Sequence, residues 1–185
     1  NIIKKNRVNN HYKNTPHIIY VGRLSVDKGV FVILKALKEI KKKYNFSFSF
    51  YGNGPEKKSI ENFIQANNLN SNISLKGFIK NKKLIFKKAD LFINASLWEG
   101  LPNALVQSIN YSVFPICSDA PGGNIEVIKK GEFGLSFKTN DEKDLQKKII
   151  NFLNNKFKLN NKNRIKHLKN YTELKSNLKY LKTLN

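Results

Sequence analysis

Short apolar runs alternate with longer, partly polar segments along most of this 185-residue chain. Each run ends in residues that favour turns, which is typical of strands. Strands that alternate with helical segments favour a parallel sheet built from βα units. The predicted strands are His17 to Val21, Phe46 to Tyr51, Ile73 to Lys76, Leu91 to Ala95, Phe114 to Ser118 and Leu135 to Phe137.

Helical periodicity fills the gaps between these strands. Apolar residues recur at three- and four-residue steps from Val30 to Ile40, with lysines on the opposite side. Pro55 opens a second predicted helix and Pro102 a fourth, because proline suits the first helical turn. A shorter third helix is expected over Lys82 to Lys88, and Asp141 can cap a fifth.

This order predicts an α/β fold with a Rossmann-like doubly wound parallel sheet, in which ligands bind beyond the carboxyl ends of the strands. We expect a single domain over residues 1–185, because a chain of this length supports one full core. The core should span about residues 17–153. Residues 155–185 indicate a basic helical tail, solvated or weakly docked, with an imperfect stripe of Leu168, Leu174, Leu178 and Leu181.

The formal charge of +21 raises the question of a polyanionic partner. The excess comes from 34 Lys and Arg against 13 Asp and Glu, and it is spread along the chain among many Asn and Ile. Such a spread is also what an AT-rich genome produces at surface positions that are not under selection. We favour this explanation over nucleic-acid binding, since no zinc-finger spacing, RNA-binding aromatic pattern or basic-zipper heptad accompanies the charge. We expect no specific nucleic-acid partner, although the charge suits an anionic membrane surface.

The sequence contains no apolar run near the roughly 20 residues that cross a bilayer, and no signal-peptide pattern. Cys117 is the one cysteine, so no disulfide can form within the chain. We therefore expect a cytoplasmic location, with the basic surface suited to the inner face of the cell membrane. His11, His17 and His167 lack the spacing of metal ligands, so no metal site is expected.

Four segments follow predicted strands and should gather at one edge of the sheet. They are Val21 to Gly29, Tyr51 to Pro55, Ser96 to Asn103 and Ser118 to Gly123. The first contains neither a dinucleotide-binding fingerprint nor a P-loop. It offers Arg23 and Lys28 instead, and two cations at a crevice suit a diphosphate, because an Arg fork binds phosphate bidentately and Lys adds a point charge.

The third of these segments places Gly100 and Pro102 at the mouth of a helix. Free backbone N–H groups and the positive end of the helix dipole favour phosphate oxygens there. Glu99 lies beside them. A carboxylate at a phosphate-binding crevice is better explained as an acceptor for sugar hydroxyls than as a phosphate ligand.

Six motifs, in their order and spacing, resemble the C-terminal domain of glycosyltransferase family 4, the group 1 glycosyl transferases, which are retaining enzymes of the GT-B fold. The resemblance runs from about Ile18 to about Ile150 and implies that the chain is the donor-binding half of a GT-B fold. The motifs are GRL-x-x-x-KG from Gly22, GNGP from Gly52, LKGFI from Leu75, AD-LFINAS from Ala89, EGLPN from Glu99 and GG-x-x-E from Gly122.

The resemblance implies a role for each site residue. The implied catalytic residues are Arg23, Lys28 and Glu99. Arg23 and Lys28 clamp the donor diphosphate, and Glu99 contacts hydroxyls of the transferred sugar. Backbone N–H groups from Asn103 to Leu105 receive phosphate oxygens. The segment from Gly77 to Lys80 lines the base pocket, largely through backbone groups at Ile79. The implied substrate-binding residues are Gly22, Asn53, Gly54, Ile79, Gly100, Leu101, Pro102, Asn103, Ala104, Leu105 and Gln107.

The resemblance also implies the reaction. A sugar passes from a nucleoside diphosphate sugar, with a UDP-sugar favoured, to a glycan or lipid-linked acceptor in bacterial surface polysaccharide synthesis. Retention of anomeric configuration and independence from metals and other cofactors are expected. GT-B enzymes react in the cleft between two domains, so we expect that transfer needs an N-terminal acceptor domain and that these 185 residues alone bind donor but turn over poorly.

One position departs from the family pattern. The family's motif holds two glutamates separated by seven residues, and here Glu99 is followed at that spacing by Gln107. A carboxylate accepts two hydroxyl protons, whereas an amide has one acceptor oxygen. We expect ribose binding through Gln107 to be weaker or differently oriented, either as a tolerated variant or in an inactive or altered-donor member.

Two other functions fit parts of the sequence. The charge alone supports a non-catalytic polyanion-binding module, which would bind DNA or heparin with a steep dependence on salt. A nucleotide-sugar epimerase of GT-B architecture would share the fold, but the EGLPN segment and the loops resemble that group less.

Overall fold

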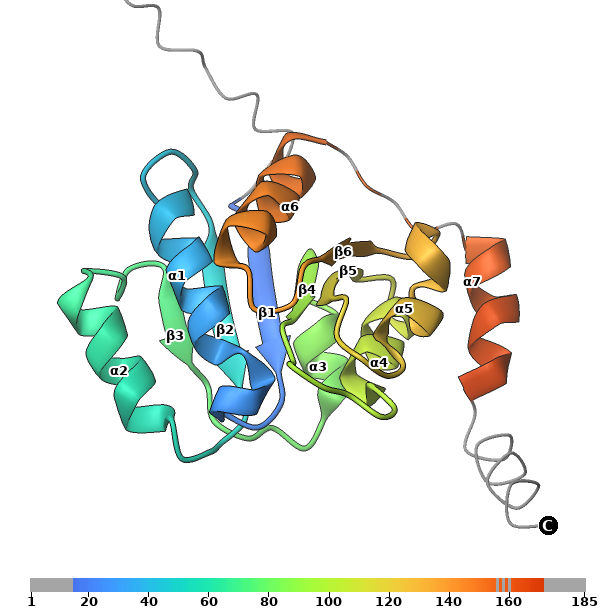
Figure 1. The fold of residues 1–185 in the computed structure, drawn as a ribbon, viewed down its shortest axis with the longest axis horizontal. Helices are drawn as coiled ribbons and strands as arrows, with labels where there is room; N and C mark the ends of the chain where they lie inside the picture. The colour runs from blue at the N-terminus through green and yellow to red at the C-terminus, as the bar shows by residue number, and fades with distance from the viewer. Residues whose placement is uncertain (1–14, 156, 158, 160, 172–185) are drawn as a thin grey trace, which may run out of the picture.

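The computed structural model describes residues 15–155, 157, 159 and 161–171. Its centre is a six-stranded parallel sheet in the order β3-β2-β1-β4-β5-β6 (Figure 1). The order reverses between β1 and β4, which is the switch point of a doubly wound sheet. The strands are β1 His17–Val21, β2 Ser47–Tyr51, β3 Ile73–Leu75, β4 Leu91–Asn94, β5 Phe114–Ser118 and β6 Leu135–Phe137.

Helices cover both faces of the sheet, with α1, α2 and α6 on one face (Figure 1). The predicted α/β, Rossmann-like fold is therefore confirmed. The helices are α1 Val30–Ile40, α2 Lys57–Ala66, α3 Lys82–Phe86, α4 Asn103–Asn110, α5 Asn124–Val127, α6 Glu142–Asn154 and α7 Asn161–Leu168, with 3-10 turns at Val26–Lys28, Lys129–Gly131 and Lys169–Tyr171.

Alternate residues of the central strands supply two separate cores. Ile18 and Tyr20 of β1 pack into the core under α1, α2 and α6, whereas Ile19 packs into the core under α3, α4 and α5. Ile18 lies in register with Phe48 of β2 and Leu91 of β4. Both faces of β1 are buried, and this explains why its sequence is a continuous apolar run rather than an alternating one.

Two predicted helix starts are shifted by the turns before them. α2 begins at Lys57 rather than at Pro55, because Pro55 and the next residue form a turn. Pro102 is the N-cap of α4, which begins at Asn103. The strand bounds differ from the predicted ones by one residue at β2, β3 and β4. At β2 and β4 the additional predicted residues, Phe46 and Ala95, are apolar and buried but lie just outside the strands.

The predicted cap of α6 is confirmed. Asp141 Oδ1 accepts hydrogen bonds from the backbone N–H groups of Lys143 and Asp144 at 3.0 and 2.9 Å. The four-residue helix α5 and the 3-10 turn at Val26–Lys28 were not predicted, because such short elements show no periodicity.

The described part of the tail is helical and packs on the domain. The ring of His167 in α7 stacks on Phe133 with centroids 4.9 Å apart, and His167 Nε2 lies 2.8 Å from the Val127 carbonyl oxygen. Leu168 packs against the same core. The other stripe leucines, Leu174, Leu178 and Leu181, lie outside the described residues. Within the described ranges, no helix is both long and apolar enough to span a bilayer.

Candidate functional site

The loops that follow β1, β2 and β4 are joined to one another by backbone hydrogen bonds. The Leu24 N–H donates to the Asn53 carbonyl at 2.9 Å, which joins the first two loops. The Leu97 N–H donates to the Asp27 carbonyl at 2.8 Å, which joins the first and third. Because each bond links the ends of different strands, the three predicted post-strand segments form one continuous surface at the carboxyl edge of the sheet.

The Glu99 loop is held by close backbone packing against the loop after β5. Glu99 forms an isolated parallel bridge with Gly122, and the Gly123 N–H donates to the Glu99 carbonyl at 3.1 Å. Gly122 has a φ of +117°, and a Cβ there would collide with the Glu99 carbonyl oxygen. Only glycine satisfies both conditions, which explains the first glycine of the Gly-Gly pair in this motif.

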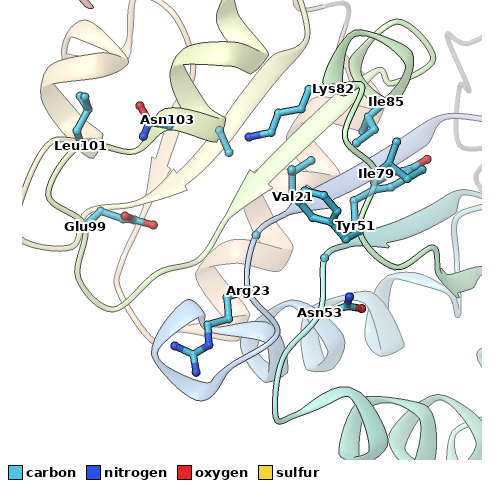
Figure 2. Close-up of a pocket in the computed structure, with 14 residues that line it drawn as sticks. Val21, Arg23, Tyr51, Asn53, Ile79, Lys82, Ile85, Glu99, Leu101 and Asn103 are labelled. Atoms are coloured by element: carbon cyan, nitrogen blue, oxygen red, sulfur yellow. The ribbon is translucent and has the colours of Figure 1, made fainter. Parts of the chain in front are cut away.

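A cavity of about 510 Å³ lies at this edge (Figure 2). Its wall includes polar groups from the loops after β1 and β4 and apolar groups from β1, β2 and α3. The predicted site residues that line it are Gly22, Arg23, Asn53, Ile79, Glu99, Leu101, Asn103 and Ala104. The structure thus brings together most of the residues that sequence reasoning selected.

The remaining predicted residues lie beside the cavity rather than on its wall. Gly54 packs on the backbone of Leu24, where a Cβ would collide. Pro102 is buried at the start of α4, and Gly100 is exposed in the loop before it. The Leu105 side chain is fully buried in the core, so only its backbone can take part in binding, as predicted.

Lys28 does not line the cavity but forms an ion pair with Glu99. Lys28 Nζ lies 2.9 Å from Glu99 Oε1, and the two side chains are 24% and 19% exposed. The Ser96 hydroxyl lies 2.8 Å from the same oxygen. Glu99 Oε2 has no hydrogen-bond or ion-pair partner among the described residues, so it is the oxygen available to a ligand.

Arg23 is exposed, and its guanidinium has no partner among the residues that the structure describes. Its backbone is held in place, because the Tyr20 hydroxyl donates to the Arg23 carbonyl at 2.6 Å. Burial, followed by the nearby charges of Glu99 and Asp27, raises the pKa of Tyr20 well above its ordinary value. Tyr20 therefore stays protonated and remains a hydrogen-bond donor.

The N-terminus of α4 presents two backbone amides near the cavity. The Asn103 N–H is already used, since it donates to the Leu101 carbonyl at 2.9 Å. In the described structure the N–H groups of Ala104 and Leu105 have no backbone acceptor, as is usual in a first helical turn. Of the three amides predicted to receive phosphate oxygens, these two are free to do so.

Gln107 lies on α4 outside the cavity wall. Its Oε1 is buried and has no hydrogen-bond partner in the described part of the chain. Its predicted contact with ribose stays a prediction.

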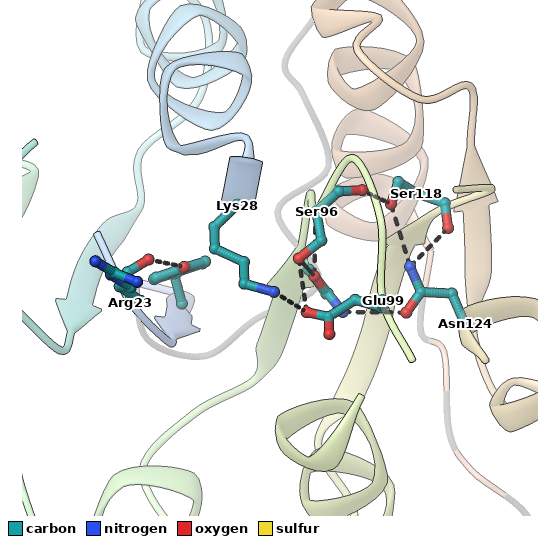
Figure 3. Close-up of polar contacts among 8 residues, drawn as sticks. Arg23, Lys28, Ser96, Glu99, Ser118 and Asn124 are labelled. Atoms are coloured by element: carbon teal, nitrogen blue, oxygen red, sulfur yellow. Dashed lines mark hydrogen bonds and ion pairs between the residues drawn. The ribbon is translucent and has the colours of Figure 1, made fainter. Parts of the chain in front are cut away.

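Four more wall residues lie in segments that the sequence had indicated: Val21, Tyr51 and Gly52 in the post-strand segments, and Phe78 in the predicted base-pocket segment from Gly77 to Lys80. Sequence reasoning missed Lys82 and Ile85. Lys82 adds a cation, but in a chain with 34 Lys and Arg no local signal separates it from the others. Sequence reasoning also missed a set of buried polar side chains that lie next to Glu99, namely Asn94, Ser96, Ser118 and Asn124 (Figure 3). For Asn94 and Ser118, a polar residue at the end of an apolar strand was the available signal.

Among the described residues, no group of three or more His, Cys, Asp or Glu side chains is placed to hold a metal ion.

The fold and the cavity define an α/β ligand-binding domain of the Rossmann type. The chain belongs to the family Glycosyl transferases group 1, whose model matches residues 1–182. It is 30% identical over 139 residues, covering 74% of this chain and 38% of the relative, to an alpha-1,4-N-acetyl-D-galactosaminyltransferase of Campylobacter jejuni. The full name of that relative includes the lipid-linked glycan GalNAc-alpha-(1->4)-GalNAc-alpha-(1->3)-diNAcBac-PP-undecaprenol. The chain spans 30% to 38% of the length of the first curated relatives it matches.

Solved structures share the fold. The catalytic domain of cholesterol-alpha-glucosyltransferase from Helicobacter pylori superimposes with a TM-score of 0.66 at 25% identity, covering 88% of this chain and 99% of that one. HepE of Anabaena, in complex with UDP, superimposes with a TM-score of 0.67 at 21% identity, covering 75% and 38%. The expectation that the chain forms one half of a GT-B fold is confirmed.

Proposed function

We propose that the cavity binds a nucleoside diphosphate sugar and that the chain supplies donor recognition to a retaining glycosyltransferase. The observation that carries the proposal is the cavity of about 510 Å³ at the carboxyl ends of β1, β2 and β4, where Arg23, Glu99 and the start of α4 meet. Ligands of doubly wound sheets bind at this switch point.

The diphosphate would lie against Arg23 and the free amides of Ala104 and Leu105. An unpaired guanidinium and the first amides of a helix are both suited to phosphate oxygens. As the bond to the sugar breaks, negative charge grows on the departing diphosphate, and fixed donors that face it lower the barrier. These groups supply the stabilisation that a metal provides elsewhere, and we propose transfer without a metal or other cofactor.

The sugar would lie near Glu99, whose Oε2 can accept a hydroxyl proton. Lys28 holds Oε1 and compensates the charge of the carboxylate beside the phosphates. We therefore assign Lys28 two roles: it holds the Glu99 carboxylate in place, and it reduces the repulsion between this carboxylate and the diphosphate.

The base would occupy the apolar end of the cavity. Tyr51, Ile79 and Ile85 lie on the opposite side of the cavity from Glu99 and Leu101 (Figure 2). A flat, partly apolar base suits such a surface. The UDP complex of the Anabaena protein supports uridine as the base.

The acceptor would be a glycan or a lipid-linked glycan in bacterial surface polysaccharide synthesis, which the name of the Campylobacter relative supports. We propose that transfer also needs a second, acceptor-binding domain, as the greater length of the relatives suggests. A groove between α1 and α6 has a net basic lining and supports contact with an anionic membrane surface. Its charged residues are Lys35, Lys38, Lys143 and Lys147 with Glu39 and Glu142.

The test is a titration of uridine and guanosine diphosphate sugars into the chain and its Arg23→Ala variant. Calorimetry measures the affinities, and thermal melting measures the stabilisation by each ligand. We expect a UDP-sugar to bind and Arg23→Ala to weaken it by about 10-fold or more, as for loss of a charge-assisted hydrogen bond. Lys58→Ala removes an exposed cation of α2 and serves as the control. Absence of nucleotide binding, with steep salt-dependent DNA binding, would instead favour the polyanion-binding module.

A further inference from the structure

A chain of buried polar side chains runs from Glu99 into the core (Figure 3). Asn94 ends β4 and Ser118 ends β5, and Asn124 begins α5. Asn94, Ser96, Ser118 and Asn124 are only 6%, 1%, 0% and 0% exposed. The network therefore lies beneath the site and outside the reach of solvent.

Backbone groups determine the orientation of both amide side chains in this network. The Asn124 amide must donate from Nδ2 to the Ser118 carbonyl, at 3.1 Å, because a carbonyl only accepts. Asn124 Oδ1 then accepts from Asn94 Nδ2 at 3.1 Å. Asn94 Oδ1 is left to accept from the Ser96 backbone N–H at 3.2 Å and lies 2.8 Å from the Ser96 hydroxyl. Neither amide can flip without losing a bond to the backbone.

The Ser96 hydroxyl is the link between this network and the site. It lies 2.8 Å from Glu99 Oε1 and 2.8 Å from Asn94 Oδ1, and its single proton is shared between these two acceptors. The Ser96 carbonyl in turn accepts from the Ser118 hydroxyl at 2.6 Å. The position of the Ser96 side chain is thus set from both sides, and Glu99 Oε1 is held between Ser96 and Lys28.

Polar groups buried this deeply cost stability unless each is satisfied, and apolar residues would fill the same volume without that cost. Networks of this kind are justified by the rigidity that they impose. Here the network ends at the Glu99 carboxylate and restricts its orientation. With Oε1 held, Oε2 has a defined direction at the cavity wall.

We propose that Ser96, Asn94 and Asn124 are positioning residues that orient the Glu99 carboxylate for recognition of the donor sugar. The inference rests on the proposed function, in which Glu99 Oε2 accepts a sugar hydroxyl. Arg23 and the amides of α4 have no hydrogen bond to the network within the described residues. The network therefore controls the contribution of the sugar to binding and not that of the nucleotide.

The experiment compares the affinity of UDP with that of a UDP-sugar, by calorimetry, for the unchanged chain and a set of variants. The probe is whichever of UDP-glucose, UDP-galactose, UDP-N-acetylglucosamine and UDP-N-acetylgalactosamine binds the unchanged chain most tightly. The sugar increment is the ratio of the two dissociation constants. The variants are Glu99→Gln, Ser96→Ala, Asn124→Ala and, as a matched buried serine away from the site, Ser49→Ala, with circular dichroism to verify folding.

We expect Ser96→Ala to reduce the sugar increment by about 5-fold or more, as for loss of a hydrogen bond to a charged group, while UDP affinity changes less than about 2-fold. Asn124→Ala, which acts through Asn94 and Ser96, should change the two quantities in the same way. Ser49→Ala should change neither. A merely structural defect would weaken UDP and the UDP-sugar together, and that outcome overturns the proposal.

The outcomes also separate the inference from the function on which it rests. If Glu99→Gln removes the sugar increment but Ser96→Ala and Asn124→Ala keep it, the positioning role is wrong and the proposed function stands. If Glu99→Gln keeps the increment, or if neither UDP nor any of the probes binds, the proposed function and the inference both fail. If Asn124→Ala does not fold, Ser96→Ala alone decides, because it leaves the two amides bonded to each other.

Discussion

The ion pair between Lys28 and Glu99 couples two groups that the sequence treats as independent. They are 71 residues apart, and the pattern around each suggests a separate ligand, a diphosphate for one and a sugar for the other. In the folded chain, Lys28 neutralises a carboxylate that would otherwise repel a bound diphosphate. At the scale of single residues, the charge that Glu99 presents to the cavity therefore depends on its ion pair with Lys28.

Gln107 is the residue whose chemistry departs most from the family pattern, and its buried Oε1 has no partner in the described structure. We expect Gln107→Glu to lower the melting temperature of the free chain, because a carboxylate there is desolvated without compensation. If this position faces ribose, UDP should raise the melting temperature of the variant more than that of the unchanged chain.

Melting curves with and without UDP check both parts of this prediction. Gln65→Glu, the same substitution at an exposed position of α2, should leave both values unchanged. Equal stabilisation of the variant and the unchanged chain by UDP would place Gln107 outside the site.

At the scale of elements, the loops after β4 and β5 approach each other so closely that only a residue without a side chain fits between them. The Gly122 loop after β5 lies directly on the Glu99 carbonyl. A sequence shows that a glycine is present, but the backbone that it approaches comes from another strand. The motif could therefore be recognised from the sequence, while its contact could not be derived.

Gly122→Ala tests this contact, with Gly131→Ala as a matched control. Both glycines have a left-handed φ, of +117° and +106°, but a Cβ at Gly131 would have nothing within 4 Å. We expect Gly131→Ala to cost about 1 to 3 kcal/mol, the usual cost of backbone strain. Gly122→Ala should cost more, because the Cβ also displaces the Glu99 loop.

Urea unfolding measures the two free energies, and calorimetry should show loss of UDP-sugar binding only in Gly122→Ala. Equal costs for the two variants would mean that strain alone acts at Gly122.

The ends of β5 and β6 are tied by Asp119, which accepts hydrogen bonds from the Thr139 N–H and hydroxyl at 2.7 and 2.6 Å. The Thr139 hydroxyl is the main cause of a pKa of Asp119 below its ordinary value. A lowered folded-state pKa means that this stabilisation is present at neutral pH and is lost as the pH falls through that pKa.

We therefore expect Asp119→Asn to lower the free energy of unfolding at neutral pH, and this difference to shrink as the pH falls below the ordinary carboxyl pKa and through the lowered pKa of Asp119. Denaturant unfolding at neutral pH and over a series of acid pH values checks this. Glu61→Gln, at an exposed position of α2, should show no such difference. A gap that is independent of pH would exclude the charge of Asp119 as its cause.

At the scale of the whole molecule, a small part of the net charge of +21 lies around a second groove, of about 690 Å³. Its lining includes four lysines, the two glutamates Glu39 and Glu142, and the apolar residues Ala36, Phe63 and Ile150. A net basic lining that also contains apolar residues suits a phospholipid surface better than a nucleic acid, because Phe63 alone offers no aromatic stacking row for bases. This groove is built from α1, α2 and α6, whereas the cavity lies at the strand ends.

Membrane contact through this groove is tested by charge reversal. We expect Lys38→Glu with Lys147→Glu to weaken binding to vesicles of mixed phosphatidylglycerol and phosphatidylcholine by roughly 30-fold or more, at about 1 kcal/mol for each lysine. Lys57→Glu with Lys58→Glu changes the net charge equally on α2 and should have a smaller effect. Vesicle sedimentation measures both, and equal losses would mean that net charge alone drives the binding.

The sequence by itself determined the strands, the two-sided burial of the sheet and the position of the site at the strand ends. These depend on local periodicity and on the general geometry of parallel sheets, which act over a few residues. It also selected Arg23, Glu99 and Asn103 on the cavity wall. Only the tertiary structure decided that Lys28 pairs with Glu99, that Lys82 joins the wall, and that buried amides lie beneath the carboxylate. Those contacts join residues on different strands, and hydrogen bonding and charge act through space, so no pattern along the chain records them.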